Sequence, residues 1–342
     1  MLRIQEDMCT LLAGNEMKSR DNYVDFVRGV GILLVVFGHT CVCWQRPVFG
    51  FHMPLFFFLS GLFLSKYLAL PFRESCCKVL KKTLSPFVTF FFIGLVSYLA
   101  HVRLSIPWLR FADGIWTGHP IVNPPLWFLT SLFFSTMLAV VILRKFPVCG
   151  GYALLLGAAI LLNLVPHRIR HHFPLMMCSW PYAAAFIMAG YQSLPLLVRV
   201  RQMDRVFLCG SCGVLLVLFE IVLALRWPMS SMSYDCYFIG PFLITSILGV
   251  VGILLPSLML VKVLPTRICK GVCFVGENSL YFFCLDLVVL SWVQRMPLPQ
   301  IDILRPILLF LCQTCVLSGA VVLILYMRQR NRKENSYENR ST

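Results

Sequence analysis

The stretch Asp25–Gly61 reads DFVRGVGILLVVFGHT, then CVCWQRPVFG, then FHMPLFFFLSG, and it predicts two apolar helices joined by a short return. Arg28 and His39 are separated by about three whole helical turns, at about 3.6 residues per turn. Both side chains therefore leave one face of the first helix, about 16 Å apart along its axis. Ionisable residues inside an apolar span are rare and usually face a bundle interior or a wet cavity. We therefore treat both as candidate functional residues.

The composition indicates an all-α, polytopic integral membrane protein. The chain has 342 residues, of which 58% are hydrophobic and 13% are charged, whereas about a quarter of the residues in a soluble domain are charged. Its mean hydropathy is +0.79. The apolar residues come in runs of about twenty, the length that a helix needs to cross a bilayer. A transmembrane β-barrel would show short alternating segments instead.

We predict about ten transmembrane helices in one membrane domain, residues 23–327. A polar segment, 1–22, precedes this domain, and a charged tail, 328–342, is expected to be disordered. The spans are predicted at 24–44, 52–71, 84–102, 125–143, 148–165, 175–195, 206–226, 237–261, 272–294 and 306–327. Most Lys and Arg residues then fall on one side, so both termini are expected to be cytoplasmic.

Targeting is expected to come from the first span, whether translation begins at Met1 or at Met17. The expected location is the cell membrane, meaning the inner or plasma membrane. The net charge of +15 is explained by basic loops on the cytoplasmic side, so we do not expect a nucleic-acid partner. Most of the fifteen cysteines lie inside apolar runs and are interpreted as small core residues. No spacing of Cys and His completes a metal site, so we predict no bound metal.

His39 is the first candidate for chemistry, because an imidazole that titrates near neutrality suits a general base. The structural alternative is a histidine satisfied by a helix–helix hydrogen bond. Asp25 precedes Arg28 by one helical turn, so the two can form an ion pair. The structural alternative here is a plain interfacial pair. The functional interpretation is an arginine held in place to bind an anion, and guanidinium binds phosphate bidentately.

Four further features are less specific. His52 opens the second predicted helix and lies near His39 only if the return is tight. Trp127 is either an aromatic belt residue or the wall of a substrate pocket. Lys66 is expected to extend its amine to the cytoplasmic face. The outside loop around 103–125 could cap a site or anchor the interface.

Two other classes of function are alternatives to an enzyme. A transporter or flippase of an anionic glycan or small molecule would line its pathway with Arg28 and His39. The chain shows no two-fold hydropathy repeat with broken helices in matching places, which is typical of many transporters. A purely structural scaffold is disfavoured by the number of polar residues within the spans.

The motifs resemble those of the membrane acyltransferase-3 family, multi-pass O-acyltransferases that act mostly on bacterial surface carbohydrates. The resemblance covers about residues 21–327. It begins with D-x-x-R-G, the Arg28-to-His39 spacing and FHMPLFFFLSG. Weaker matches follow in order: KKTLSPF at 81–87, PLWFL at 125–129, PYAAAFIMAGY at 181–191 and GENSL at 276–280.

The resemblance implies an integral-membrane O-acyltransferase that uses a cytoplasmic acyl-coenzyme A, usually acetyl-CoA, as donor substrate. The acceptor would be a hydroxyl of a cell-surface or lipid-linked saccharide. His39 matches the family's essential histidine, as general base or as covalent acyl carrier, and Arg28 its paired arginine, held by Asp25. Arg28 with Lys81 or Lys82 would bind the anionic nucleotide.

The acceptor side is expected to involve His52, Trp127, Asn278 and Asp286. Two residues depart from the family pattern. Lys81 and Lys82 stand where the family commonly has arginine, so the charge stays but the bidentate fork is lost. Asp286 stands where the family often has a histidine, and it could orient a histidine or bind sugar hydroxyls.

Overall fold

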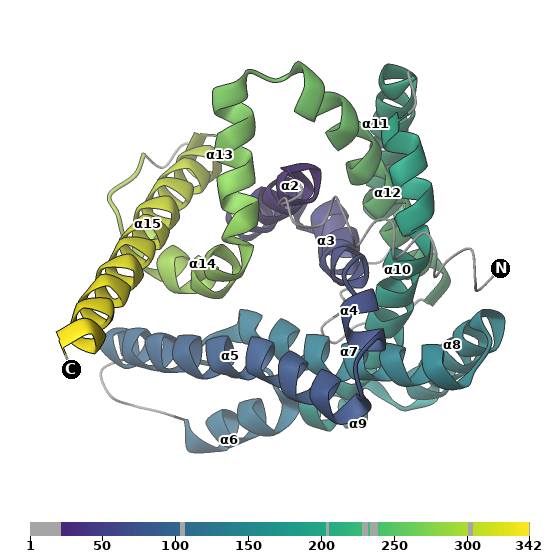
Figure 1. Cartoon of the computed structure of the whole chain (residues 1–342), viewed down its shortest axis with the longest axis horizontal. Coiled ribbons are helices and arrows are strands. Elements are labelled where there is room, and N and C mark those ends of the chain that lie inside the picture. The colour runs from purple at the N-terminus through teal and green to yellow at the C-terminus, as the bar shows by residue number, and fades with distance from the viewer. Residues whose placement is uncertain are drawn as a thin grey trace.

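The computed structural model describes residues 22–102, 107–202, 205–227, 232, 239–299 and 304–341, and in these residues it is helical without strands. The centre is formed by α2 (Asn22–Thr40) and α3 (Gln45–Gly61), joined by the short 3-10 turn η1 (Val42–Trp44). The other long helices surround this pair (Figure 1). The predicted all-α fold is therefore confirmed, with the Asp25–Gly61 stretch at its centre.

The surrounding helices follow the chain around the central pair. α5, α7 and α8 lie along one side, α10, α11 and α12 along a second, and α13, α14 and α15 along a third (Figure 1). Their bounds are Phe72–Val102 for α5, Trp127–Lys145 for α7, Val148–Leu164 for α8, Trp180–Gln202 for α10, Val206–Arg226 for α11, Ile239–Val263 for α12, Thr266–Glu277 for α13, Ser279–Val293 for α14 and Leu304–Ser341 for α15. Short helices connect them: α4 (Ser65–Leu68), α6 (Trp108–Thr117), η2 (Pro124–Leu126), α9 (His167–Arg170) and η3 (Pro174–Ser179).

Each predicted span overlaps a helix, but the helices differ in length. Seven of those described are long and apolar enough to cross a membrane, and α13 with α14 makes an eighth if the pair, bent by 80°, is one span. The remaining two, α3 and α8, have 17 residues each. The protein is therefore a multi-pass membrane protein, whereas the number of crossings and the cytoplasmic location of both termini stay predictions.

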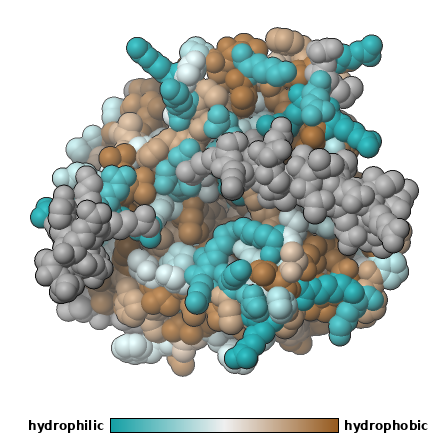
Figure 2. Space-filling view, viewed as in Figure 1, coloured by the Kyte–Doolittle hydropathy of each residue, from teal (hydrophilic) through white to brown (hydrophobic). Residues whose placement is uncertain are grey.

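The outer surface of the bundle agrees with a lipid environment. On α5 an apolar stripe of Leu84, Val88, Phe92 and Val96 recurs every fourth residue and is exposed. An exposed apolar stripe of this kind is unfavourable in water and is expected where a helix faces the hydrocarbon of a bilayer. Hydrophilic residues instead gather on the face seen in Figure 2, among areas of apolar surface.

The second helix begins earlier than predicted. We expected a span over 52–71, but α3 starts at Gln45 and ends at Gly61. Pro54 lies inside it and cannot donate a hydrogen bond to the carbonyl of Gly50, four residues before. The hydroxyl of Ser246 on α12 donates to that carbonyl instead, at 2.7 Å. Because a neighbouring helix supplies the missing donor, the proline is tolerated in the helix interior.

The helix α15 is assigned to Ser341, and the expected disorder of the tail 328–342 stays a prediction. Residues 1–21 lie outside the described ranges, so the expectations for the N-terminal segment and for Met17 stay predictions.

Candidate active site

The helices α13 and α14 lie beside α2 at the centre of the bundle, although they are far from it in the sequence. α13 and α14 pack along α2, and Gly276 lies against the backbone of Asp25 and Gly29. Further along, Asp286 of α14 reaches His39 of α2. Along α13 the contacts run opposite to α2, because Val272 meets Gly29 and Gly276 meets Asp25. After the bend, α14 returns along α2 to His39, so this pair of helices holds α2 at both of its ends.

His39 forms the centre of the polar contacts at its end of α2. Its Nδ1 is hydrogen-bonded to the carboxylate of Asp286, which is 1% exposed, whereas the histidine side chain is 20% exposed. An ionised carboxylate can only accept, so Nδ1 carries the hydrogen, and in the neutral imidazole Nε2 then keeps its lone pair. The arrangement suits a general base, because the carboxylate fixes the tautomer and stabilises the imidazolium that forms. Of the two roles considered for Asp286, this contact favours orienting the histidine.

His52 is brought close to His39 by the tight return. The ring of Phe49 lies between them, with its centroid 5.4 Å from the His39 ring and 5.0 Å from the His52 ring. His52 is buried, and its Nδ1 is 2.9 Å from the carbonyl oxygen of Val48. His52 therefore lies near His39 on the neighbouring helix α3, and its Nδ1 is already hydrogen-bonded to the Val48 carbonyl.

At the other end of α2, Arg28 meets Asp25 as the spacing predicts. The guanidinium is 3.6 Å from the Asp25 carboxylate and lies over the ring of Phe63, 5.0 Å from its centroid. The arginine side chain is 26% exposed, whereas Asp25 is almost fully buried. The buried carboxylate therefore orients the arginine while part of the guanidinium stays accessible.

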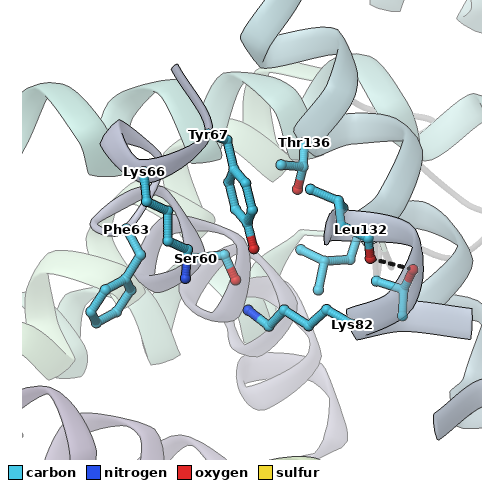
Figure 3. Close-up of a pocket in the computed structure, with 9 residues that line it drawn as sticks. Ser60, Phe63, Lys66, Tyr67, Lys82, Leu132 and Thr136 are labelled. Carbon is cyan, nitrogen blue, oxygen red and sulfur yellow. Dashed lines mark hydrogen bonds between the residues drawn. The ribbon is translucent and has the colours of Figure 1, made fainter. Parts of the chain in front are cut away.

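A pocket opens beside Phe63, with a volume of about 300 Å³ including space open to solvent. It is lined by Ser60, Phe63, Lys66, Tyr67, Val79, Lys82, Thr83, Leu132 and Thr136. Figure 3 shows the amines of Lys66 and Lys82 directed into the same space as the hydroxyls of Ser60 and Tyr67. The walls come from α3, α4, α5 and α7, so the pocket is formed where four helices meet.

Three cations act together here, and we call Arg28, Lys66 and Lys82 the basic cluster. The charges of Lys66 and Arg28 both act on Lys82. Loss of surrounding water, and then the charge of Arg28, lower the pKa of the Lys66 ammonium. A bound anion would reduce the repulsion among these positive groups, since a nearby opposite charge favours their charged forms. Both Lys81 and Lys82 are exposed residues, but only Lys82 lines the pocket.

Aromatic side chains fill the bundle between the two ends of α2. Phe56 packs against Gly31, which lies between Arg28 and His39. The rings of Phe128 and Phe283 are 6.2 and 6.4 Å from that of Phe56 and 5.2 Å from each other. Phe128 is one helical turn before Leu132 in the pocket wall. These buried rings therefore fill the core between the pocket wall and the middle of α2.

The two remaining acceptor-side candidates lie elsewhere. Trp127 is 8% exposed and belongs to the hydrophobic core, so it is not an exposed belt residue. Asn278 lies at the break between α13 and α14, where its amide donates to the carbonyl of Phe274 at 2.9 Å. That break is near the Asp25 end of α2, because Gly276 touches Asp25. The structure thus places Asn278 at the end of α2 opposite to His39.

Two site residues escaped the sequence analysis. Lys66 was interpreted only as a lysine that reaches the membrane surface, although it lines the pocket. The sequence pattern does not single out Gln313, whose amide donates to the backbone carbonyl of Asp286 at 3.0 Å and to the Asp286 carboxylate. A lone glutamine in the apolar run FLCQTC was the available signal, since polar residues within spans usually bond to another helix.

No group of three or more His, Cys, Asp or Glu residues is placed to hold a metal ion in the part of the chain that the structure describes. A comparison with protein families finds that a model described as an acyltransferase domain matches residues 21–327. No curated protein matches the chain.

Proposed function

The chain belongs to the membrane acyltransferase-3 family, and we propose that it transfers an acyl group, acetyl in the simplest case, from a cytoplasmic acyl-CoA to a hydroxyl of a saccharide. The saccharide would be a cell-surface or lipid-linked glycan at the inner or plasma membrane. Membership of the family makes the chain an acyltransferase and disfavours the transporter alternative. The observation that supports the detailed proposal is the pairing of His39 with Asp286 at one end of α2 and the basic cluster at the other.

The basic cluster suits the nucleotide of coenzyme A, which carries several phosphate charges. Guanidinium and ammonium groups bind phosphate through charge-assisted hydrogen bonds. Tyr67 and Ser60 add hydroxyls to the same pocket. Arg28 and His39 are about 16 Å apart along α2, at ~1.5 Å per residue, which approaches the reach of an extended pantetheine arm. A donor bound by its phosphates would therefore bring its thioester toward the imidazole.

The chemical step follows from the tautomer of His39. Nε2 accepts the proton of the acceptor hydroxyl while the oxygen attacks the thioester carbon, and the buried Asp286 carboxylate stabilises the imidazolium. When the tetrahedral intermediate collapses, the carbon–sulfur bond breaks and the imidazolium returns the proton to the leaving thiolate. The products are the acyl ester and free coenzyme A. No net proton is gained or lost by the protein.

A direct transfer is preferred here over an acyl-histidine. Asp286 holds the imidazole as in triads where histidine is the base. A covalent carrier would accumulate label on the protein when the acceptor is withheld. Protein that carries acid-labile label on His39 would therefore contradict the base role and favour the carrier.

The test uses membranes that contain the protein, radiolabelled acetyl-CoA and an extract of host lipid-linked glycans. Wild type is compared with His39→Ala and with His101→Ala, all at equal insertion. His101 is a suitable control because its ring bonds backbone carbonyls of Ser97 and Ser291, away from the proposed site. We expect label in saccharide with wild type and His101→Ala, and none with His39→Ala.

Three other results would change the proposal. Equal label with His39→Ala would exclude this histidine as the base. Label transferred only from a longer acyl-CoA would change the acyl group and keep the rest. If no acyl-CoA delivers label to any glycan fraction, the proposed pairing of an acyl-CoA donor with a glycan acceptor is wrong.

A further inference from the structure

Gln313 is a fully buried polar residue on a helix that otherwise faces lipid or core. It belongs to α15, which packs beside α14 and α2 (Figure 1), and its side chain is 0% exposed. One turn before it, the ring of Phe310 packs edge-on against Phe37 of α2, with centroids 5.6 Å apart. This apolar contact fixes the height of α15 relative to α2 and so places the glutamine beside Asp286.

The amide of Gln313 makes two hydrogen bonds to a single residue. Its Nε2 donates to the backbone carbonyl of Asp286 at 3.0 Å and to the carboxylate oxygen Oδ1 of the same residue. The other carboxylate oxygen, Oδ2, accepts from His39. Turning the amide over would put its oxygen against two acceptors, so the donor orientation is the only one that the neighbours allow.

The remaining atom of the amide distinguishes a functional role from a structural one. Oε1 of Gln313 is buried and has no hydrogen-bond partner among the described residues. A buried acceptor without a partner lowers stability. An apolar side chain of the same length would pack here without that penalty, so packing alone does not account for a glutamine.

We propose that Gln313 is a positioning residue for acyl transfer: by holding Oδ1 of Asp286, it fixes the carboxylate so that Oδ2 keeps His39 in the Nδ1–H tautomer. The inference rests on the proposed function only in taking His39 as the base. Three helices then contribute one group each to a chain of hydrogen bonds, Gln313 from α15, Asp286 from α14 and His39 from α2. Without Gln313 the carboxylate can rotate about its last bond, and the imidazole loses its fixed direction.

The test compares Gln313→Met, which keeps the length but has no donor, with Thr314→Val on the same helix. Thr314 donates to the carbonyl of Phe310 and touches neither member of the pair, so its loss reports on the helix alone. We expect Gln313→Met to lower kcat for acetyl transfer by about 10- to 100-fold, the range of one charge-assisted hydrogen bond, with KM for the donor unchanged. Thr314→Val should leave both constants near wild type.

A second measurement does not need an acceptor. In full-length protein labelled with ¹⁵N-histidine, the His39 signals, assigned by their loss in His39→Ala, should show one Nδ1–H tautomer in wild type and a tautomer mixture in Gln313→Met. An unchanged tautomer, or an unchanged kcat, would overturn the inference. Equal losses in Gln313→Met and Thr314→Val would also overturn it, because a purely structural role predicts them. If wild type transfers no acyl group, the proposed function fails while the tautomer still decides the role of Gln313.

Discussion

The backbone carbonyl oxygen of Asp25 lies so close to Gly276 that a side-chain carbon on Gly276 would overlap it. Gly276→Ala should therefore separate α13 from α2 and lower the free energy of unfolding by about 1–3 kcal/mol, as overpacking does. Gly271→Ala on the same helix is the control, because nothing lies within 4 Å of the added carbon. Thermal unfolding in detergent measures both. Equal midpoints for the two variants would show that the close contact does not limit packing.

Asp286→Asn should lower kcat far more than it changes the KM for the donor. The amide can present its own hydrogens to His39, which favours the wrong tautomer, and in triads this change costs up to about 10⁴-fold in kcat. Ser291→Ala on α14, which removes a hydroxyl bonded to the Val288 carbonyl, should be nearly neutral. Steady-state acetyl transfer is the measurement. A rise in KM with unchanged kcat would instead assign Asp286 to acceptor binding.

Lys81 and Lys82 should behave differently although they are neighbours in the sequence. Lys82 lines the pocket and Lys81 does not, so Lys82→Ala should raise the KM for acyl-CoA about tenfold, or about 1.4 kcal/mol. Lys81→Ala should change it little, as expected for a solvated charge. Inhibition by free coenzyme A gives an independent measure of donor affinity. The reverse order of effects would place the nucleotide outside this pocket.

The basic cluster also predicts how donor affinity depends on pH. The pKa of Lys66 is lowered, so its neutral form appears at a lower pH than for an ordinary lysine. A neutral amine attracts phosphate less, so the KM for the donor should rise as the pH rises through this lowered pKa and stay flat below it. Lys66→Arg stays charged throughout and should weaken the rise. Identical pH dependence of KM in the two proteins would show that Lys66 does not meet the donor.

Phe56 is expected to limit the space for the pantetheine arm of the donor. It packs against Gly31 on the stretch of α2 between the basic cluster and His39. Phe56→Leu would change the shape of that stretch and should alter the KM for acyl-CoA more than kcat. Phe51→Leu is the matched control, since Phe51 lies on the same helix but packs against Gly249 of α12. Steady-state acetyl transfer measures both constants, and equal changes in both variants would indicate a general loosening of α3.

The sequence predicted most of the fold because long apolar runs can only be satisfied as helices in lipid. What it missed depends on contacts across the bundle. The early start of α3 requires the Ser246 hydroxyl for the carbonyl left free by Pro54, and no local pattern shows that donor. The 80° bend at Asn278 likewise lies next to the close contact of Gly276 with α2, which no local pattern shows.

The site was predicted in part. The Arg28-to-His39 spacing and the Asp25–Arg28 pair could be read from helical geometry alone. The Asp286 contact with His39 could be named only as one of two roles, because it joins residues 247 positions apart. Gln313 and Lys66 were missed because a single polar residue in a span, or at its end, has many possible partners. The catalytic and binding roles themselves stay predictions.

The two attachments of α2, to Gly276 at Asp25 and to Asp286 at His39, restrict how this helix can change in length. One residue inserted between them would turn the imidazole by about 100° and advance it by about 1.5 Å, out of reach of its carboxylate. Only insertions close to whole turns, about seven or eleven residues, would turn the imidazole back toward the Asp286 side of the helix. The reach from the basic cluster to the imidazole can therefore change only in large steps. Small differences in donor length have to be absorbed by the pocket walls, where single side chains can be exchanged one at a time.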